Sequence, residues 1–304
     1  MALFRFCCPC LDSEDGVVSP SAVLEPLVTG TGGSRTLTKG ENSSDVGPAD
    51  SAEQSVYVLR HGHRQDEESD CWHVRASRPW DPPLSAKGRQ QAREAGQLFK
   101  GKNIDYVLTS PFLRCLQTSA EIVDELGLAQ GRWLVVWPMC ELCDPRLLLA
   151  GRDDVKPVLG KRPIREWMWD GQTLDEAVAG MLAPELAHSG VGIRPEMWSD
   201  NPPSYPEKLD AALKRYEKQI KAICKDFAGR NVLVVTHGEA LRAAVNLHDT
   251  RASVYEVKHT GYVPLHRERK PAPQGSSSNG KPGAWGPWSM VCTSGQTGVM
   301  WSYA

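Results

Sequence analysis

The sequence predicts an α/β fold with a mostly parallel central sheet and helices on both faces, and three observations support this prediction. Short apolar runs alternate with amphipathic segments whose apolar residues recur every three or four positions. The apolar runs are continuous, as in Val232-Leu233-Val234-Val235, which indicates strands buried on both faces. Polar motifs directly follow several of these runs. In such sheets, binding and catalytic groups gather at the carboxyl ends of the strands.

The first half of the domain contains three expected strands and two expected helices. The strands lie at 56–59, 104–108 and 133–137, and the helices run from 85 to about 100 and from 110 to about 126. Ser85 is the expected N-cap of the first helix. Ser110 is the expected N-cap of the second, with Pro111 at its first helical position.

The second half begins with a stretch of weak periodicity at about 142–203, which we interpret as an insertion. Pro206 then opens the clearest amphipathic helix, which Gly229 ends. The remaining expected elements are a buried strand at 232–236, a helix at 239–246, and closing strands at 254–258 and 262–265.

Charge is distributed unevenly along the chain. The 304 residues include 35 Lys and Arg and 37 Asp and Glu, a formal charge of −2, yet residues 1–53 carry −5 and residues 269–304 carry +3. Both ends are rich in Gly, Ser and Pro, a composition that buries too little apolar surface to offset the entropy of ordering. We therefore expect one domain at 54–268 between a disordered N-terminal tail and a mostly flexible C-terminal tail. Part of the second tail can dock through its tryptophans, Trp285, Trp288 and Trp301.

Composition argues against two classes of protein. The longest apolar runs are far shorter than the ~18 residues that a bilayer-spanning helix needs, which argues against a transmembrane protein. The near-neutral charge provides no basic footprint, so we expect no nucleic-acid partner.

The cysteines predict a reducing compartment. There are nine, an odd number, and no sustained apolar leader precedes them, so we expect a cytoplasmic protein with mostly free thiols. The cluster Cys7, Cys8 and Cys10 has two interpretations: acylation that gives peripheral membrane association, or a disordered tail with incidental cysteines. Cys140 and Cys143 have CxxC spacing but no second pair at zinc-finger distance, so zinc is not favoured there.

Three polar motifs follow expected strands. Arg60-His61-Gly62 follows the first, Ser110 to Arg114 follows the second, and Thr236-His237-Gly238 follows the strand at 232–236. Each motif alone is weak, because a single His after a strand is usually structural. An Arg in the first turn of a helix opposes the helix dipole, and a bound anion would resolve that conflict. The free N–H groups of that turn and the planar guanidinium of Arg114 both suit a phosphate.

Taken together, the motifs resemble the histidine phosphatase superfamily, also called phosphoglycerate mutase-like. The resemblance comprises Arg60-His61-Gly62, Ser110-Pro111-x-x-Arg114-Cys115-x-Gln117-Thr118, Glu141 and Thr236-His237-Gly238. Order, spacing and secondary-structure context agree over about residues 54–268. The resemblance implies the phosphoglycerate mutase-like fold.

Two stretches are similar to one branch of that superfamily, the suppressor-of-T-cell-signalling-type phosphatases and their plant relatives. They are Arg60-His61-Gly62-His63-Arg64 and Ser77-Arg78-Pro79-Trp80-Asp81-Pro82-Pro83-Leu84. Glycolytic mutases instead follow Arg-His-Gly with Glu-Ser and carry a downstream Trp-Asn, which this chain lacks. His63 departs from the acidic residue often found at its position.

The resemblance implies a metal-independent phosphomonoester hydrolase that needs no cofactor. His61 would attack phosphorus as a neutral imidazole and form a phosphohistidine intermediate. Arg60, Arg64 and Arg114, together with His237, would surround the phosphoryl oxygens and stabilise their charge.

The implied proton donor is Glu141, which would protonate the leaving oxygen and then activate water. Asp144 is its rival for this role. The expected partner is a phosphorylated substrate, either a small molecule or a phosphopeptide. The sequence leaves the substrate and the oligomeric state open.

Two other functions remain open. One is a regulatory or scaffold protein that binds phospho-ligands with little turnover, which the long tails and the insertion suggest. The other is a phosphomutase, which needs a persistent phosphoenzyme. Five tryptophans either line a substrate mouth or pack the insertion: Trp72, Trp80, Trp167, Trp169 and Trp198.

Overall fold

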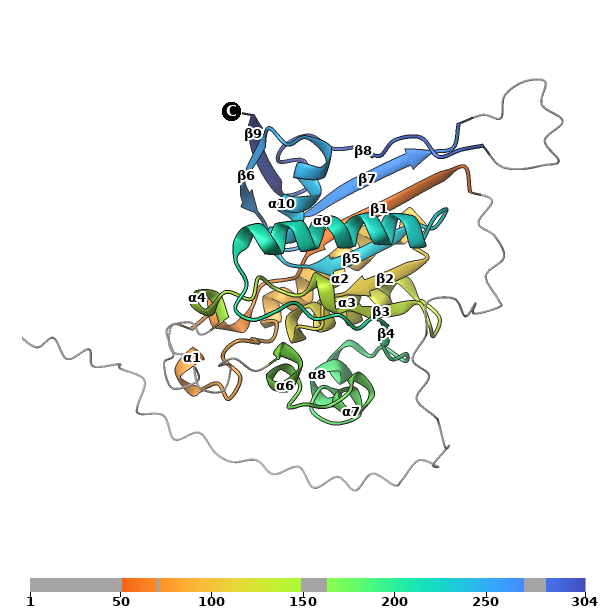
Figure 1. Cartoon of the computed structure of the whole chain (residues 1–304). Helices are drawn as coiled ribbons and strands as arrows, with labels where there is room; N and C mark the ends of the chain where they lie inside the picture. The colour runs from red at the N-terminus through yellow and green to blue at the C-terminus, as the bar shows by residue number, and fades with distance from the viewer. Residues whose placement is uncertain (1–50, 70–71, 149–162, 271–282, 304) are drawn as a thin grey trace, which may run out of the picture. The chain divides into compact units, whose positions relative to one another are not determined.

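A seven-stranded sheet forms the centre of the fold (Figure 1). The computed structural model describes residues 51–69, 72–148, 163–270 and 283–303. In sheet order, the strands are β4 (Glu196–Ser199), β3 (Trp133–Val136), β2 (Tyr106–Thr109), β5 (Val232–Thr236), β1 (Glu53–Arg60), β7 (Tyr262–Glu268) and β8 (Ser289–Met290). The first five are parallel, whereas β7 and β8 are antiparallel to their neighbours. The predicted α/β fold with a mostly parallel sheet is therefore confirmed.

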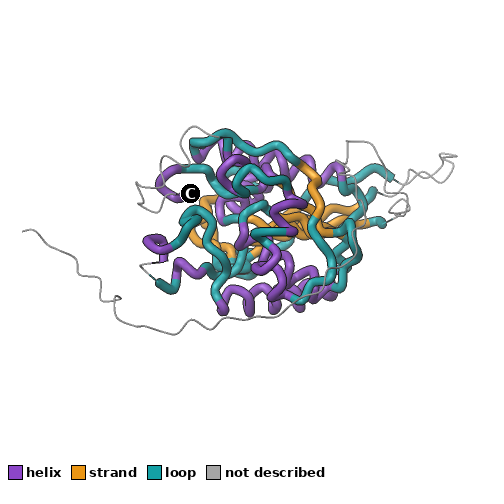
Figure 2. Tube along the Cα trace, turned by 90° about the horizontal axis from the view of Figure 1, so that it is seen from below, coloured by secondary structure: helices purple, strands orange, loops and turns teal. Residues whose placement is uncertain are grey.

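Helices cover both faces of the sheet, and Figure 2 shows the strands between them. On one face lie α2 (Ala86–Phe99) and α3 (Leu113–Leu126), and on the other lie α9 (Leu209–Asp226) and α10 (Gly238–His248). Strand β5 serves both cores: Leu233 and Val235 pack with α2 and α3, and Val232 and Val234 pack with α9 and α10. Because every position of the strand is buried, its sequence is apolar without interruption.

Two predicted helix N-caps have different outcomes. Ser85 caps α2, and its hydroxyl accepts a hydrogen bond from Gly88 N at 3.1 Å, as expected. Ser110 does not cap α3, because the helix begins at Leu113. The Leu113 N–H instead donates to Asp81 Oδ1 at 2.8 Å, so a carboxylate from another loop stabilises this helix end.

The inserted segment at about 142–203 is built mainly of short helices. They are α4 (Pro145–Leu148), α6 (Ile164–Met168), α7 (Leu174–Ala179) and α8 (Ala183–Leu186). The segment also supplies the edge strand β4, which the sequence did not predict. Trp167 and Trp169 are buried in the same core as α2 and α3, so they pack the insertion. Its residues 149–162 lie outside the described part of the chain.

The C-terminal tail differs from its prediction. In the described part of the tail, β8 extends the main sheet beside β7, and β9 (Val299–Tyr303) pairs with β6 (Ala252–Val257) in a second, two-stranded sheet. Trp301 is buried against α10 and β6, in agreement with the expectation that part of the tail docks through its tryptophans. A mostly flexible tail is therefore wrong for residues 283–303, because backbone pairing and indole burial fix them. The predicted N-terminal tail with Cys7, Cys8 and Cys10, and residues 271–282, lie outside the described residues.

The described residues contain no helix that is both long and apolar enough to cross a membrane.

Candidate active site

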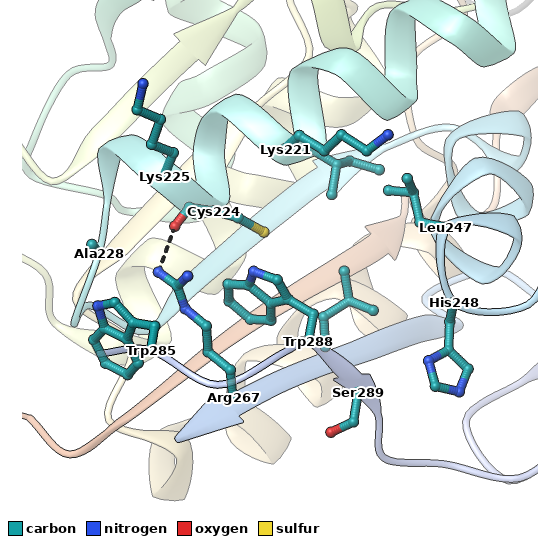
Figure 3. A pocket seen from close by; sticks show the side chains of 12 residues that line it. Lys221, Cys224, Lys225, Ala228, Leu247, His248, Arg267, Trp285, Trp288 and Ser289 are labelled. Carbon is teal, nitrogen blue, oxygen red and sulfur yellow. Dashed lines mark hydrogen bonds between the residues drawn. The ribbon is translucent and has the colours of Figure 1, made fainter. Parts of the chain in front are cut away.

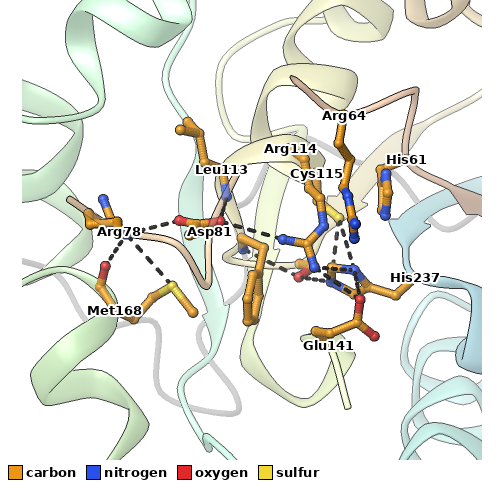
Figure 4. Close-up of polar contacts among 12 residues, drawn as sticks. His61, Arg64, Arg78, Asp81, Leu113, Arg114, Cys115, Glu141, Met168 and His237 are labelled. Carbon is orange, nitrogen blue, oxygen red and sulfur yellow. Dashed lines mark hydrogen bonds and ion pairs between the residues drawn. The ribbon is translucent and has the colours of Figure 1, made fainter. Parts of the chain in front are cut away.

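The carboxyl ends of four parallel strands bring the predicted residues together (Figure 4). Strand β1 ends at Arg60, beside Thr236 at the end of β5, so His61 and His237 follow neighbouring strands. A short 3-10 turn (Trp137–Met139) after β3 leads to Glu141. Three side chains meet here: His61, Glu141 and His237. Each contributes one nitrogen or oxygen atom to a group in which all atoms lie within 4.8 Å of one another.

His61 is buried, with 2% of its surface exposed, and one hydrogen bond fixes its ring. Its Nδ1 lies 2.7 Å from the carbonyl oxygen of Gly62. Because a carbonyl can only accept, Nδ1 carries the proton and Nε2 keeps a free lone pair. Burial lowers the pKa of His61 well below its usual value, and the charges of Arg114 and other neighbouring groups lower it further. The imidazole is therefore neutral at physiological pH and can act as a nucleophile.

Gly62 is required by close packing of the backbone. A Cβ atom at this position would lie 2.5 Å from the carbonyl oxygen of Gly88 in α2. The Gly62 N–H also donates to Thr118 Oγ1 at 3.1 Å. The turn that carries His61 is thus held against two helices, which explains why the motif ends in glycine.

Arg114 lies in the first turn of α3 and is almost fully buried. Its Nη2 donates to Glu141 Oε2 at 3.0 Å, and its Nη1 forms an ion pair with Asp81 Oδ1 at 3.7 Å. Within the part of the chain that the structure describes, Nε and Nη1 have no hydrogen-bond partner. A buried guanidinium with unused donors is suited to bind an anion.

His237 completes the cluster between Glu141 and Ser110. Its Nδ1 lies 3.1 Å from Glu141 Oε2, and its Nε2 lies 2.9 Å from Ser110 Oγ. A carboxylate can only accept, so Nδ1 donates to Glu141 and the Ser110 hydroxyl donates to Nε2. The predicted role of Ser110 as a helix cap is thereby replaced by a contact with His237.

The charges in the cluster follow from burial and from Arg114. Burial lowers the pKa of His237 to about 4, although Glu141 counteracts it. Burial raises the pKa of Glu141, but the electrostatic interaction and hydrogen bond with His237 and the positive charge of Arg114 outweigh it and hold the pKa well below its usual value. At neutral pH, the cluster is therefore a carboxylate and two neutral imidazoles beside the permanent positive charge of Arg114.

The other two predicted arginines lie next to this cluster. The charge of Arg60 helps to lower the pKa of His61, while its own Nη1 donates to the carbonyl of Val257 at 2.5 Å. Arg64 forms a bidentate pair with Asp66, with both distances 2.9 Å. It lines a pocket of about 90 Å³ together with Arg114, Glu141 and Trp80.

The structure separates the two candidate proton donors. Glu141 points into the cluster, whereas Asp144 pairs with the exposed Arg146 at 2.7 Å. That side-chain hydrogen bond lowers the pKa of Asp144. The geometry thus favours Glu141.

Sequence reasoning missed the residues that position Glu141. Arg215 on α9 donates to the carbonyl oxygens of Pro138 at 2.6 Å and Cys140 at 3.2 Å, and Glu207 pairs with it at 2.8 and 2.6 Å. The Tyr216 hydroxyl donates to the Cys140 carbonyl at 2.6 Å. An arginine in an amphipathic helix usually lies in solvent, so no signal in the sequence distinguished Arg215.

Asp81 was also missed as a site residue. It is 3% exposed, and burial raises its pKa although Arg78 and Arg114 oppose this. Its Oδ2 accepts a hydrogen bond from Arg78 at 2.9 Å, and Arg78 also donates to the Met168 carbonyl in the insertion (Figure 4). Asp81 therefore connects the insertion to the helix end that carries Arg114.

The donor set His61, Glu141 and His237 is chemically able to hold a metal ion. The Arg114 guanidinium lies 3.0 Å from Glu141 and 3.3 Å from His237. A divalent cation would meet this fixed positive charge, whereas an anion would be attracted to it. The surroundings therefore favour an anion.

Comparison with known proteins identifies the family of the chain. The sequence model of the histidine phosphatase superfamily (branch 1) matches residues 56–133 and 169–262, more than half of the chain. The 2,3-bisphosphoglycerate-dependent phosphoglycerate mutase of Methylobacterium radiotolerans is 27% identical over 225 residues, which cover 70% of this chain and 88% of the relative. The 2,3-bisphosphoglycerate-dependent phosphoglycerate mutase 1 of Latilactobacillus sakei is 26% identical over 198 residues, which cover 64% of this chain and 79% of the relative.

Solved structures of phosphatases and phosphoglycerate mutases are also similar to the chain. The ecdysone phosphate phosphatase of Bombix mori, in complex with tungstate, is 19% identical with a TM-score of 0.48, and 75% of this chain and 97% of that chain are covered. The phosphoglycerate mutase of Bacillus anthracis is 20% identical with a TM-score of 0.44, and the match covers 72% of this chain and 89% of that chain. The narrower suppressor-of-T-cell-signalling and plant branch stays a prediction. On the family match over more than half of its length, the chain belongs to the histidine phosphatase superfamily.

Proposed function

We propose that this protein is a metal-independent phosphomonoester hydrolase that forms a phosphohistidine intermediate on His61. The observation that carries the proposal is a neutral His61, with Nε2 free, beside the buried Arg114, which has two unused donor nitrogens. Such a pair combines a nucleophile with a fixed binding site for the oxygens of a phosphoryl group.

Binding of the phosphoryl group would use the unused donors of Arg114. The low exposure of the guanidinium strengthens its attraction to the anion, because little water screens it. The leaving group would occupy the pocket of about 90 Å³ beside Glu141, where Arg64 and Trp80 lie. As substrate class we propose a phosphorylated small molecule, in keeping with the phosphoglycerate mutases among the relatives.

In the first step, the lone pair on His61 Nε2 would attack phosphorus as the bond from phosphorus to the leaving oxygen breaks. Nδ1 keeps its proton and its bond to Gly62, so the positive charge that develops on the ring is shared with a carbonyl oxygen. Glu141 would give a proton to the leaving oxygen, and the products would be an alcohol and phosphorylated His61.

Glu141 must carry a proton for this step, although it is ionised in the free protein. Substrate binding would change this protonation state. The phosphoryl group would bring negative charge next to the Glu141 carboxylate and would accept hydrogen bonds from Arg114, which weakens the interaction of Arg114 with Glu141. Both effects raise the pKa of Glu141 when the substrate binds, so the carboxylate takes up one proton from solvent before the first step. In the second step, the carboxylate would remove a proton from water, whose oxygen attacks phosphorus. The bond from phosphorus to Nε2 breaks, and phosphate leaves.

The nucleophile is tested with 4-nitrophenyl phosphate in the presence of EDTA. His61→Ala should lower kcat by at least about 10³-fold, while His63→Ala, in the same loop but outside the cluster, should retain activity. A quenched reaction with radiolabelled substrate should yield an acid-labile phosphoenzyme in the wild type and none in His61→Ala. Activity that requires a metal, or that survives His61→Ala, would refute the proposal.

The proton donor is tested by comparing two leaving groups. Nitrophenolate leaves readily without a proton, whereas an alkoxide does not. Glu141→Gln should therefore slow hydrolysis of 2-glycerophosphate by about 10²–10³-fold, more than hydrolysis of the nitrophenyl ester. Asp144→Asn is the matched control and should leave both rates unchanged. Equal loss with the two substrates would exclude Glu141 as the general acid.

A phosphomutase is the second candidate, because both curated relatives named above are phosphoglycerate mutases. A mutase returns the phosphoryl group to a second hydroxyl before water reaches it. Incubation with 3-phosphoglycerate and 2,3-bisphosphoglycerate distinguishes the two: isomer formation that exceeds phosphate release would make the protein a mutase. Tight vanadate binding without turnover of any phosphoester would instead indicate a phospho-ligand-binding protein.

A further inference from the structure

A second cavity, of about 370 Å³, lies between α9, the end of α10, β7 and the C-terminal segment (Figure 3). Arg267, which lines it, pairs with Gln54 near the start of β1, whereas His61 follows the end of that strand. The cavity therefore lies toward the amino ends of the parallel strands, away from the catalytic cluster. Its volume is within the range of small-molecule sites in proteins.

The base of the cavity is apolar. Ile220 and Leu265 are 1% and 4% exposed, and Leu247 adds a further aliphatic side chain from α10. Water in contact with this surface gains few hydrogen bonds, so an apolar group that displaces it is favoured.

Two tryptophans form a fixed wall around Arg267. The Arg267 guanidinium lies 4.5 Å from the ring centre of Trp285 and 4.6 Å from that of Trp288, and it donates to the carbonyl of Cys224 at 3.1 Å (Figure 3). Arg269 covers Trp285 as well, at 4.4 Å. These contacts fix the wall in advance, so a ligand would not have to order it.

The charge on the lining is of one sign. Lys221, Lys225 and Arg267 are basic, and no acidic side chain is among the residues that line the cavity in the described part of the chain. Lys221 lies 3.9 Å from Glu217 on the solvent side of α9, whereas Lys225 makes no ion pair with any described residue. Both lysines are exposed and can turn toward the cavity mouth.

From this combination we infer a binding site for a small amphipathic anion, with an aryl or acyl body in the cavity and one acidic head group at Lys221 and Lys225. The apolar base and indole wall would hold the body, and the two ammonium groups would neutralise the head. A neutral ligand would gain nothing from the positive charge of Lys221 and Lys225 at the mouth, and a strongly polar anion would not fill the apolar base.

The test uses 8-anilinonaphthalene-1-sulfonate as an aryl probe and dodecanoate as an acyl competitor, both with the full chain. The probe should bind one site, with energy transfer from nearby tryptophans, and dodecanoate should displace it while vanadate should not. Lys221→Glu/Lys225→Glu should weaken binding about tenfold or more. The control is Lys214→Glu/Lys218→Glu, which makes the same charge change at the same spacing on α9 but outside the cavity. This variant should leave the affinity for the probe unchanged.

Three results would overturn the inference: equal weakening in both double variants, no weakening in Lys221→Glu/Lys225→Glu, or displacement of the probe by vanadate. Trp288→Ala tests the apolar wall and should also lower the affinity for the probe. Thermal unfolding confirms that this variant is folded. Hydrolysis of 4-nitrophenyl phosphate should be unchanged in the lysine variants. This readout keeps the inference separate from the proposed phosphatase activity.

Discussion

Two arginines with little exposure, Arg215 and Arg114, contact the short segment that carries Glu141, and their hydrogen bonding differs. Arg215 uses every guanidinium nitrogen, with two bonds to Glu207 and bonds to the carbonyls of Pro138 and Cys140. Arg114 makes one short bond to the Glu141 carboxylate and leaves Nε and Nη1 without hydrogen bonds among the described residues. Their side chains are similarly protected, with 12% and 2% exposed.

The difference shows how the same side chain can serve structure or binding. A saturated guanidinium has its charge and all its donors neutralised within the protein, so it fixes the backbone and offers nothing to a ligand. A guanidinium with unused N–H groups can still donate hydrogen bonds to an anion that binds beside it. Four tests examine this distinction, from the largest expected effect to the smallest.

The largest effect is expected for Arg215→Met. The change leaves Glu207 buried and unpaired, so the free energy of unfolding should fall by about 3–5 kcal/mol. Denaturant unfolding measures this loss. In the double variant Arg215→Met/Glu207→Gln, stability should partly recover, because no unpaired buried charge remains. A loss below about 1 kcal/mol in the single variant would show that Arg215 is not the structural arginine.

Arg114→Lys should lower activity strongly and stability little, the opposite of Arg215→Met. A lysine keeps the charge but loses the planar set of donors, so kcat/KM for 4-nitrophenyl phosphate should fall about 10²–10³-fold. Vanadate affinity should fall in parallel, whereas the free energy of unfolding should change much less than in Arg215→Met. If stability falls as much as activity, the two arginines do not differ in the way proposed.

The third test uses pH, because Arg114 contacts a histidine and Arg215 does not. The pKa of His237 is about 4 in the folded protein against about 6.5 when unfolded, so the unfolded chain binds more protons between these values. The free energy of unfolding should therefore fall as the pH drops from 6.5 toward 4, by at most about 1.4 kcal/mol per pH unit for this residue. His61, whose pKa is also lowered, adds to the same slope.

Urea unfolding at pH 7, 6 and 5 measures this slope. His237→Gln should reduce it, whereas His248→Gln, at an exposed position on α10, should leave it as in the wild type. An unchanged slope in His237→Gln would mean that His237 is not held neutral by burial.

The smallest effect is expected for the carboxylate beside Arg114. Asp81 lies 3.7 Å from Nη1, without the two short bonds that Glu207 makes to Arg215. Asp81→Asn can still accept from the Leu113 N–H and should cost about 1 kcal/mol, less than Glu207→Gln. Asp81→Ala loses the helix cap and should cost about 1 kcal/mol more than Asp81→Asn. Equal costs for Asp81→Asn and Glu207→Gln would contradict the comparison.

Much of the central sheet could be predicted from the sequence. The buried parallel strands are continuous apolar runs, and the turns after β1, β2 and β5 carry the polar motifs. Because parallel strands end at one edge, His61, Arg114 and His237 were expected near one another. Glu141 came from the family resemblance, and the choice against Asp144 needed the path of the backbone, since the two residues are only three positions apart.

The remaining features depend on contacts between distant residues. The cap of α3 is Asp81, which lies in an earlier loop, and nearby Ser110 was the better candidate by local rules. Strand β4 is short and half-buried at the sheet edge, so it lacks a strong pattern. The C-terminal strands lie in a stretch rich in Gly and Ser, and they are ordered by pairing with the distant strands β6 and β7 and by burial of Trp301.

The turn after β6 has a consequence for how the protein is made. Gly261 accepts the Arg60 N–H, directly before His61, and lies so close to Gly298 that a Cβ atom would be 2.9 Å from the Gly298 carbonyl oxygen. Lys258 N and Tyr262 N donate to the carbonyls of Gly298 and Thr297. The backbone contacts that support the proposed nucleophile His61 are therefore completed by residues that are translated long after His61 itself. A ribosome-bound chain would lack this support for the turn that carries His61 until the segment before β9 emerges, and a label attached after β9 would be attached to the segment that provides the support.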